Sequence, residues 1–281
     1  MGQVHILTDS TSDVPVEVAA RLRITVVPAY VQVGNRSYRD GPFPGSLSRE
    51  EFYTQLPTMS VVPTTAVPPA HEFAMAYRGL VGEADEVIAI VISTELSGMY
   101  NVAHLGAQEV PDLKVHIVDS GQVTMGLGWM VIAAAEAAAS GKSAGEILAL
   151  VEDMKHRVHV YAMLDTLKYL RRSGRVGWAQ ARAAHILHIK PIVEVLLGKV
   201  RELGRARTRV RAIERLVELT RDLGPLERLA ILHTYAPGVE GLHRRLANLC
   251  SPKQQHTVAV TTIIGAHVGP RGLGVAAVTA E

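Results

Sequence analysis

The 281-residue sequence is poor in cysteine, with Cys250 as its single thiol. One cysteine can form neither an intrachain disulfide nor a cysteine-based zinc site, and this scarcity is typical of proteins from a reducing compartment. No apolar run reaches the roughly 18 residues that a membrane-spanning helix needs. Residues 1–9 also lack the basic start and long apolar stretch of a signal peptide. We therefore expect a soluble, cytoplasmic protein.

Aromatic side chains are also scarce, at 5 % of the chain, so we expect the wall of any pocket to be mostly aliphatic. Apolar residues make up 48 % and charged residues 20 %, a balance that excludes a disordered chain. A chain of this length can bury a sufficient core without disulfides or metals, in one large domain or two ordinary ones.

Positive charge is concentrated in one region of the chain. The formal net charge is only +2, yet residues 155–215 hold 15 Lys and Arg against 4 Asp and Glu. Arginines alternate from Arg205 to Arg211, as one face of a strand would present them, and a solvated face is the simplest interpretation. Nucleic-acid binding favours aromatic side chains or a helix-turn-helix beside the charge. Neither is found in residues 201–215, so we expect no nucleic-acid partner and favour a protein or phosphate partner with an acidic surface.

Short apolar runs alternate with helix-like segments through the first half of the chain, which predicts a mostly parallel sheet flanked by helices. The pattern changes after a strand that begins near residue 158. We therefore predict an α/β protein of two α/β domains, residues 1–157 and residues 158–281. The expected strands are 4–8, 24–27, 36–39, 87–92, 115–118, 158–164, 192–196, 200–203, 229–233, 258–263 and 274–278. The expected helices are 16–21, 48–56, 99–108, 123–139, 167–172, 178–187, 210–223 and 239–249.

Three of the expected strands end in loops rich in hydroxyl and carboxylate side chains. These loops are residues 9–13, 93–98 and 119–120, and each precedes a helix. Ligands of an open parallel sheet bind beyond the carboxyl ends of its strands, where the N–H groups of the next helix favour an anion. Such residues can equally be simple helix caps. Ser97 is the stronger binding candidate, because Gly98 lets a ligand approach the backbone closely.

A catalytic role for Ser97 is open at this point but has little sequence support. The nucleophile elbow of α/β-hydrolases has glycines two residues before and after the serine, and Glu95 and Met99 stand at those positions. The sequence contains no P-loop motif, and the glycines of residues 269–274 precede a strand instead of a helix.

The histidines suggest one site residue and no metal centre. His185 and His188 have ligand spacing, but no nearby carboxylate or H-E-x-x-H motif completes a set, so we expect no metal. His267 lies between Gly265 and Gly269, in what reads as a glycine- and proline-rich loop after a strand. We expect this loop to direct the imidazole towards a crevice.

Taken together, these segments resemble the DegV family of bacterial fatty-acid-binding proteins. Each match is weak alone, but eight in register form a specific pattern along nearly the whole chain. They are TDSTSD at 8–13, PTT at 63–65, LSGMY at 96–100, VDS at 118–120, TLKYL at 166–170 with SGR at 173–175, IKPI at 189–192, RTR at 207–209 and GAHVGP at 265–270. The resemblance implies two α/β domains with one fatty acid buried between them and its carboxylate near the surface.

The resemblance also implies the residues of the site. The positions that match the family's carboxylate-binding residues are Thr64, Ser97 and His267. Neighbouring positions that would support them are Thr65, Gly98 and Arg175. Arg207 and Arg209 match the region that faces a fatty-acid kinase in the family.

Three departures from the family pattern bear on chain preference and on the mouth of the site. Ala66-Val67 stand where Gln-Pro is usual, and Glu95 and Arg271 replace small residues. They leave the implied carboxylate-binding set unchanged.

We therefore predict a lipid-binding carrier without a cofactor. It would bind a long-chain fatty acid and present the carboxylate to a partner kinase that makes acyl phosphate, as a monomer with transient contact to a membrane surface. One alternative is a serine-dependent lipid hydrolase or acyltransferase that uses Ser97 and His267. Another is an interaction or nucleic-acid module based on residues 155–215. The preferred acyl length depends on where an apolar tunnel ends, which the sequence leaves open.

Overall fold

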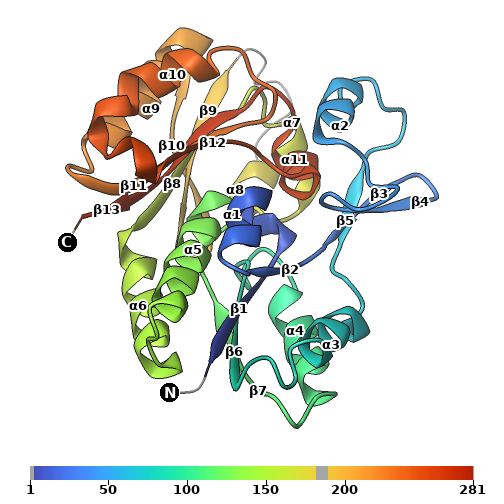
Figure 1. The fold of residues 1–281 in the computed structure, drawn as a ribbon. Coiled ribbons are helices and arrows are strands. Elements are labelled where there is room, and N and C mark those ends of the chain that lie inside the picture. Colours follow the sequence, from blue (N-terminus) through green and yellow to red (C-terminus); the bar gives the residue numbers. More distant parts are fainter. Residues whose placement is uncertain (1–2, 182–188, 281) are drawn as a thin grey trace.

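The computed structural model describes residues 3–181 and 189–280 and confirms the α/β architecture (Figure 1). The first half is built on a wholly parallel sheet of four strands in the order β2-β1-β6-β7. These strands are β1 (Val4–Asp9), β2 (Thr25–Val27), β6 (Glu86–Val91) and β7 (Lys114–Asp119). β6 is buried along nearly its whole length, because helices cover the sheet on both faces.

The helices of the first half lie in two layers around this sheet (Figure 1). α5 (Met125–Ala139) and α6 (Ala144–Arg157) pack on one face, and α3 (Ala70–Arg78) and α4 (Met99–Gln108) pack together on the other. α6 begins with a complete capping box, in which Ser143 and Glu146 each bond to the backbone N–H of the other.

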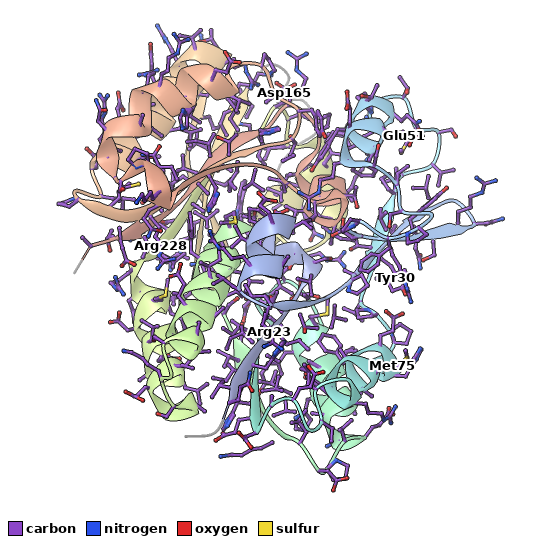
Figure 2. The ribbon with its side chains drawn as sticks, viewed as in Figure 1. Arg23, Tyr30, Glu51, Met75, Asp165 and Arg228 are labelled. Carbon is purple, nitrogen blue, oxygen red and sulfur yellow. The ribbon has the colours of Figure 1, made fainter. Side chains whose placement is uncertain are left out.

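A small antiparallel sheet lies beside the parallel sheet and its covering helices. Its strands are β3 (Tyr30–Val33), β4 (Arg36–Arg39) and β5 (Thr64–Ala66), in the order β4-β3-β5. The turn at Gly34-Asn35 joins β3 and β4 as a hairpin, and Gly34 supplies the positive φ of +60° that the turn requires. α2 (Arg49–Gln55) separates β4 from β5 in the chain, and Figure 2 labels Tyr30 of β3 and Glu51 of α2.

The second half is built on a six-strand sheet in the order β10-β9-β8-β13-β11-β12. Its neighbours are antiparallel except for the β11–β12 pair. The strands are β8 (Val158–Met163), β9 (Lys190–Leu196), β10 (Lys199–Ala206), β11 (Leu226–His233), β12 (Gln255–Ala259) and β13 (Leu273–Thr279). α9 (Arg209–Arg221) and α10 (Val239–Leu246) cover its outer face.

Four short helices and three 3₁₀ turns connect these layers. The helices are α1 (Val16–Arg21), α7 (Lys168–Ser173), α8 (Gly177–Gln180) and α11 (Thr262–Val268). The 3₁₀ turns are η1 (Ser10–Ser12), η2 (Ala247–Leu249) and η3 (Pro252–Gln254). Among the helices of the described ranges, none has the length and apolar character that crossing a membrane requires.

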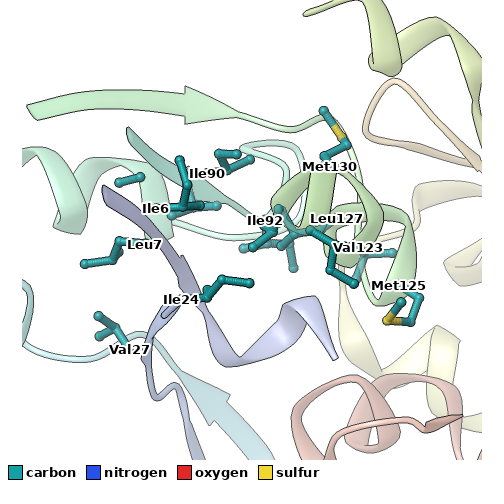
Figure 3. Close-up of a cluster of buried hydrophobic side chains, with 14 of the residues drawn as sticks. Ile6, Leu7, Ile24, Val27, Ile90, Ile92, Val123, Met125, Leu127 and Met130 are labelled. Carbon is teal, nitrogen blue, oxygen red and sulfur yellow. The ribbon is translucent and has the colours of Figure 1, made fainter. Parts of the chain in front are cut away.

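α5 is the element that both large sheets share. Its side chains pack against β1 and β6 on one side and against β8, β11 and β13 on the other. Figure 3 shows Leu127 and Met130 of α5 beside the buried side chains of β1 and β6. Towards the second sheet, Trp129 Nε1 donates to the Ala276 carbonyl at 3.0 Å. Arg228 of β11 lies at the same junction (Figure 2) and pairs with Glu136 at 2.7 Å. The predicted boundary after residue 157 falls where α6 meets β8.

The structure corrects the expected element over 258–263. β12 ends at Ala259, and α11 begins at Thr262 because the Thr261 hydroxyl caps it by accepting from Ile264 N. His267 therefore lies in the last turn of a helix and not in a loop. The elements β3, β5, α3 and α6 were not among those expected from the sequence. Of the expected helix over 178–187, the described part is α8, and the rest lies outside the described residues together with His185 and His188.

Candidate functional site

A cavity of about 520 Å³ lies between the loops of the first sheet and the inner face of the second. Its floor is a row of residues in register across four strands, Val193 of β9, Ala162 of β8, Gly274 of β13 and Leu232 of β11. The small residues in the middle of this row leave the space open. Among the described lining residues there is no Phe, Tyr or Trp, as the composition predicts. The cavity suits a long, flexible, apolar ligand.

Polar side chains from four separate segments line the same cavity. They are Thr65 of β5, Ser97 before α4, Arg175 after α7 and His267 of α11. The topology thus brings together residues that are up to 202 positions apart, since His267 Nε2 lies 2.9 Å from Thr65 Oγ1.

His267 is neutral at physiological pH in this arrangement. Burial, and to a smaller extent the positive charge of Arg175, lower the pKa of His267 from 6.5 to about 4. One ring nitrogen is then a donor and the other an acceptor. A carboxylate bound beside the ring would raise this pKa, because an anion favours the imidazolium form.

Ser97 and Arg175 supply two further groups for an anion. Ser97 Oγ accepts a hydrogen bond from Met99 N at 3.3 Å, which leaves its O–H free to donate to a ligand. Arg175 is exposed, its guanidinium donates to the Ser173 carbonyl at 2.6 Å, and no acidic side chain of the described residues lies within ion-pair distance of it. The rim therefore offers hydroxyl donors and one positive charge.

The geometry gives little support to a catalytic pair. Ser97 and His267 both line the cavity, yet the structure has no hydrogen bond between them, and the imidazole contacts Thr65 instead. Nucleophilic catalysis needs the serine within hydrogen-bond reach of its base. No group of three potential metal ligands occurs among the described residues.

A comparison with family models gives one match over nearly the full length. The matching family is described as "Uncharacterised protein, DegV family", and its model covers residues 3–280. The chain belongs to the DegV family. DegV domain-containing proteins from Streptomyces coelicolor and Deinococcus radiodurans are 35 % and 34 % identical to it, each over 97 % of both chains.

Solved structures of DegV proteins have the same fold. A DegV family protein from Thermus thermophilus, described by its fatty acid binding, is 31 % identical with a TM-score of 0.90 over 99 % of this chain and 100 % of that one. DegV from Bacillus subtilis, described as a fatty acid binding protein, is 28 % identical with a TM-score of 0.89 over the whole of both chains.

The structure places Thr64 away from the cavity of this DegV protein. Successive side chains of a strand point to opposite faces, so Thr64 and Thr65 of β5 cannot both face the cavity. Thr65 lines it, whereas Thr64 is exposed and its hydroxyl lies 3.4 Å from Gln32 Oε1 on the neighbouring strand. Thr65 therefore lines the cavity and Thr64 does not, and Gly98 lines it beside Ser97.

The two arginines that the DegV resemblance implied as partner contacts lie in different environments. Arg207 is exposed, at the junction of β10 and α9. Arg209 is mostly buried, and its guanidinium donates to the carbonyls of Pro237 and Arg271 at 2.8 and 2.7 Å. Arg209 therefore holds two loops of its own chain, and only Arg207 faces outward.

Six polar lining residues were not singled out individually from the sequence. They are Thr11, Thr94, Thr124, Ser173, His233 and Thr234. Thr11 lies in a loop that was expected to reach a ligand, and His233 and Thr234 end β11 in the same way. Applied to the second half of this DegV chain, the rule that ligands bind at strand ends would have indicated His233 and Thr234.

Proposed function

We propose that this protein binds one long-chain fatty acid in the cavity and presents its carboxylate to a fatty-acid kinase. The observation that carries the proposal is the aliphatic cavity of about 520 Å³ with Thr65, Ser97, His267 and Arg175 at its wall. The acyl chain would lie on the row from Val193 to Leu232. The carboxylate would accept hydrogen bonds from the hydroxyls and from His267.

The energetics agree with separate roles for the acyl chain and the carboxylate. Each buried methylene contributes about 0.8 kcal/mol, so the acyl chain supplies most of the affinity. A carboxylate without donors would lose its hydration uncompensated, so the polar groups decide which end of the lipid lies at the rim. The fatty acid binding described for the relatives from Thermus thermophilus and Bacillus subtilis supports the same ligand class.

Denaturing extraction followed by mass spectrometry tests the ligand directly. We expect about one long-chain fatty acid per chain, released without a covalent bond. An acyl adduct on Ser97, or hydrolysis of acyl esters by the purified protein, would favour the hydrolase or acyltransferase. Retention on nucleic acid with no lipid present would favour the third alternative.

The neighbouring threonines of β5 give a matched test of the carboxylate site. Thr65→Val should weaken the binding of a long-chain fatty acid by about 1–3 kcal/mol, because a charged acceptor loses a donor. Thr64→Val makes the same chemical change on the other face of the strand and should leave the dissociation constant unchanged. Equal losses in both variants, measured by calorimetry or fluorescence displacement, would contradict the placement of the carboxylate.

The surface around Arg207 is the part of the molecule that we assign to the kinase. Arg205, Arg207, Arg211 and Arg215 line a surface groove together with Ile192, Leu203, Glu214 and Glu218, so that its arginines outnumber its glutamates. Arg205 pairs with Glu202 and Arg215 with Glu218, whereas no described acidic group pairs with Arg207 or Arg211. A groove of this charge favours an acidic partner surface.

Arg207→Glu should therefore reduce transfer and leave lipid binding intact. With labelled fatty acid, ATP and a fatty-acid kinase, we expect acyl phosphate formation to fall at least tenfold, because the variant places like charge against an acidic partner. Arg36→Glu, which makes the same change on exposed β4, is the control and should retain activity. A double variant that includes Arg209 is unsuitable, since it would disturb the loops that Arg209 holds. Loss of bound lipid in Arg207→Glu, or an equal effect of both variants, would overturn the assignment.

A further inference from the structure

The first turn of α11 is attached to the first half of the chain. Thr261 N donates to Asp13 Oδ1 at 2.9 Å, and Thr262 Oγ1 donates to Asp40 Oδ1 at 3.0 Å. Both carboxyl groups are buried, with 2 % of each residue exposed. α11 carries His267 in its last turn, so these bonds help to determine where the imidazole lies.

Tyr53 of α2 completes the attachment. Its hydroxyl lies 3.0 Å from the Thr261 carbonyl and 3.1 Å from the Val260 carbonyl. The ring packs so closely on α11 that a Cβ atom at Gly265 would lie 2.3 Å from Tyr53 Oη. Glycine at this position is what allows α11 to approach α2.

Asp13 also joins α11 to the wall of the cavity. Its second oxygen accepts from Thr124 Oγ1 at 2.6 Å, and Thr124 lines the cavity. Thr124 has φ 50° and ψ −145°, a conformation that a β-branched residue adopts only when its surroundings impose it. One carboxyl group therefore holds a strained wall residue and the start of the His267 helix at the same time.

We propose that Asp13 is a positioning residue for His267. Asp13 holds the first turn of α11 in place, and the attachment of this turn is coupled to the uptake and release of a proton by Asp13. The inference rests on the proposed function in one respect, since it makes the contact between His267 and the lipid carboxylate depend on Asp13.

The burial of Asp13, opposed by the charge of Arg49, determines the direction of the coupling. Arg49 of α2 lies 3.4 Å from Asp13 Oδ1, Asp40 follows β4, and the other groups that face Asp13 are Tyr53, Thr124 and Thr261. Burial raises the pKa of Asp13 from 3.8 to about 7, although Arg49 opposes the shift. Burial also raises the pKa of Asp40.

Detachment of α11 that lets water reach Asp13 returns its pKa towards 3.8, so detachment releases a proton at any pH between about 4 and 7. The detached form should therefore become more populated as pH rises through this range, by up to about tenfold per pH unit, and should level off above pH 7. The rate of lipid release should likewise rise with pH over this range and level off above pH 7.

Amide hydrogen exchange of α11 in the lipid-free protein tests the coupling without any ligand. After correction for intrinsic exchange, we expect wild-type opening to rise with pH between 5 and 7. Asp13→Asn should keep α11 attached, because the amide can accept from Thr261 N and donate to Thr124 Oγ1, and it should remove most of this pH dependence. Asp13→Ala, which lacks both contacts, should open α11 at every pH and alter the ¹⁵N shifts of the His267 ring, and Asp13→Asn should restore them. Asp112→Asn, on the exposed surface, is the control.

The variant Asp40→Asn distinguishes the contribution of Asp40 to the pH dependence from that of Asp13. A pH dependence that persists in Asp13→Asn but disappears in Asp40→Asn would overturn the role of Asp13, as would wild-type exchange that does not change with pH. Dissociation of a labelled long-chain fatty acid gives the functional readout and should show the same order of variants. A wild-type protein that binds no fatty acid would overturn the proposed function, and the exchange measurement would still decide the role of Asp13.

Discussion

Replacement of Ala162 by Phe should weaken the binding of a long-chain fatty acid at least a hundredfold while the protein stays folded. Ala162 lies between Val193 and Gly274 in the row that forms the cavity floor. A phenyl ring there would occupy space that the acyl chain needs. A hundredfold loss is about 2.7 kcal/mol, which corresponds to the exclusion of three or four methylenes at about 0.8 kcal/mol each.

Titration with fatty acids of different length tests whether the loss of affinity comes from the acyl chain. The loss in Ala162→Phe should be large for a long acyl chain and small for one of about eight carbons. Ala139→Phe adds the same ring on the exposed end of α5 and should bind both lipids like the wild type. If Ala162→Phe retains full affinity for the long chain, the lipid does not lie on this row and the assigned cavity is wrong.

Replacement of Trp129 by Ala should lower the free energy of unfolding by about 3–5 kcal/mol, the usual cost of removing a large buried aromatic side chain. Trp129 is 1 % exposed, packs beside the His256 ring at 5.3 Å between centroids, and donates to the Ala276 carbonyl. Because a domain is stable by only about 5–15 kcal/mol in total, the variant should unfold at much lower urea concentration.

Trp129→Phe is the comparison that separates packing from the hydrogen bond. It keeps most of the buried ring and loses the indole N–H, so its loss should be clearly smaller than that of Trp129→Ala. Urea unfolding followed by circular dichroism measures both. A loss below about 1 kcal/mol in Trp129→Ala would show that α5 does not hold the second sheet as the packing indicates.

Local patterns in the sequence were sufficient for most of the first half. Residues 99–108 follow a glycine and have helical periodicity, and α4 occupies the expected range. Buried β6 was predicted to within one residue at each end, because an uninterrupted apolar run of this length is typical of a parallel strand covered on both faces.

Two errors arose where distant contacts decide the local structure. Residues 258–263 are rich in Val, Thr and Ile, which favour a strand, yet the helix starts at Thr262 because Thr261 caps it and Asp13 accepts from its N–H. The choice between Thr64 and Thr65 depends in the same way on the pairing of β5 with β3. Neither contact leaves a signal in the nearby sequence.

Only those residues of the candidate site that have a local sequence signal were predictable. Ser97 and Gly98 were found from a strand end followed by a helix, a pattern contained in a few adjacent residues. Thr65 was expected only as a supporting residue, and Thr124 was not expected at all, because its exposure to the cavity depends on how α5 fits between two sheets.

The sharing of α5 by both sheets restricts how a buried ligand can be exchanged. Two lobes with separate cores could swing apart about a linker and expose everything between them. Here Trp129 and Arg228 join the lobes on the side of α5, so a wide hinge motion would break a continuous core. Exchange of the ligand therefore favours small displacements at the opposite edge, where the short helix α11 is held by polar contacts to Asp13 and Asp40 and by packing against the Tyr53 ring.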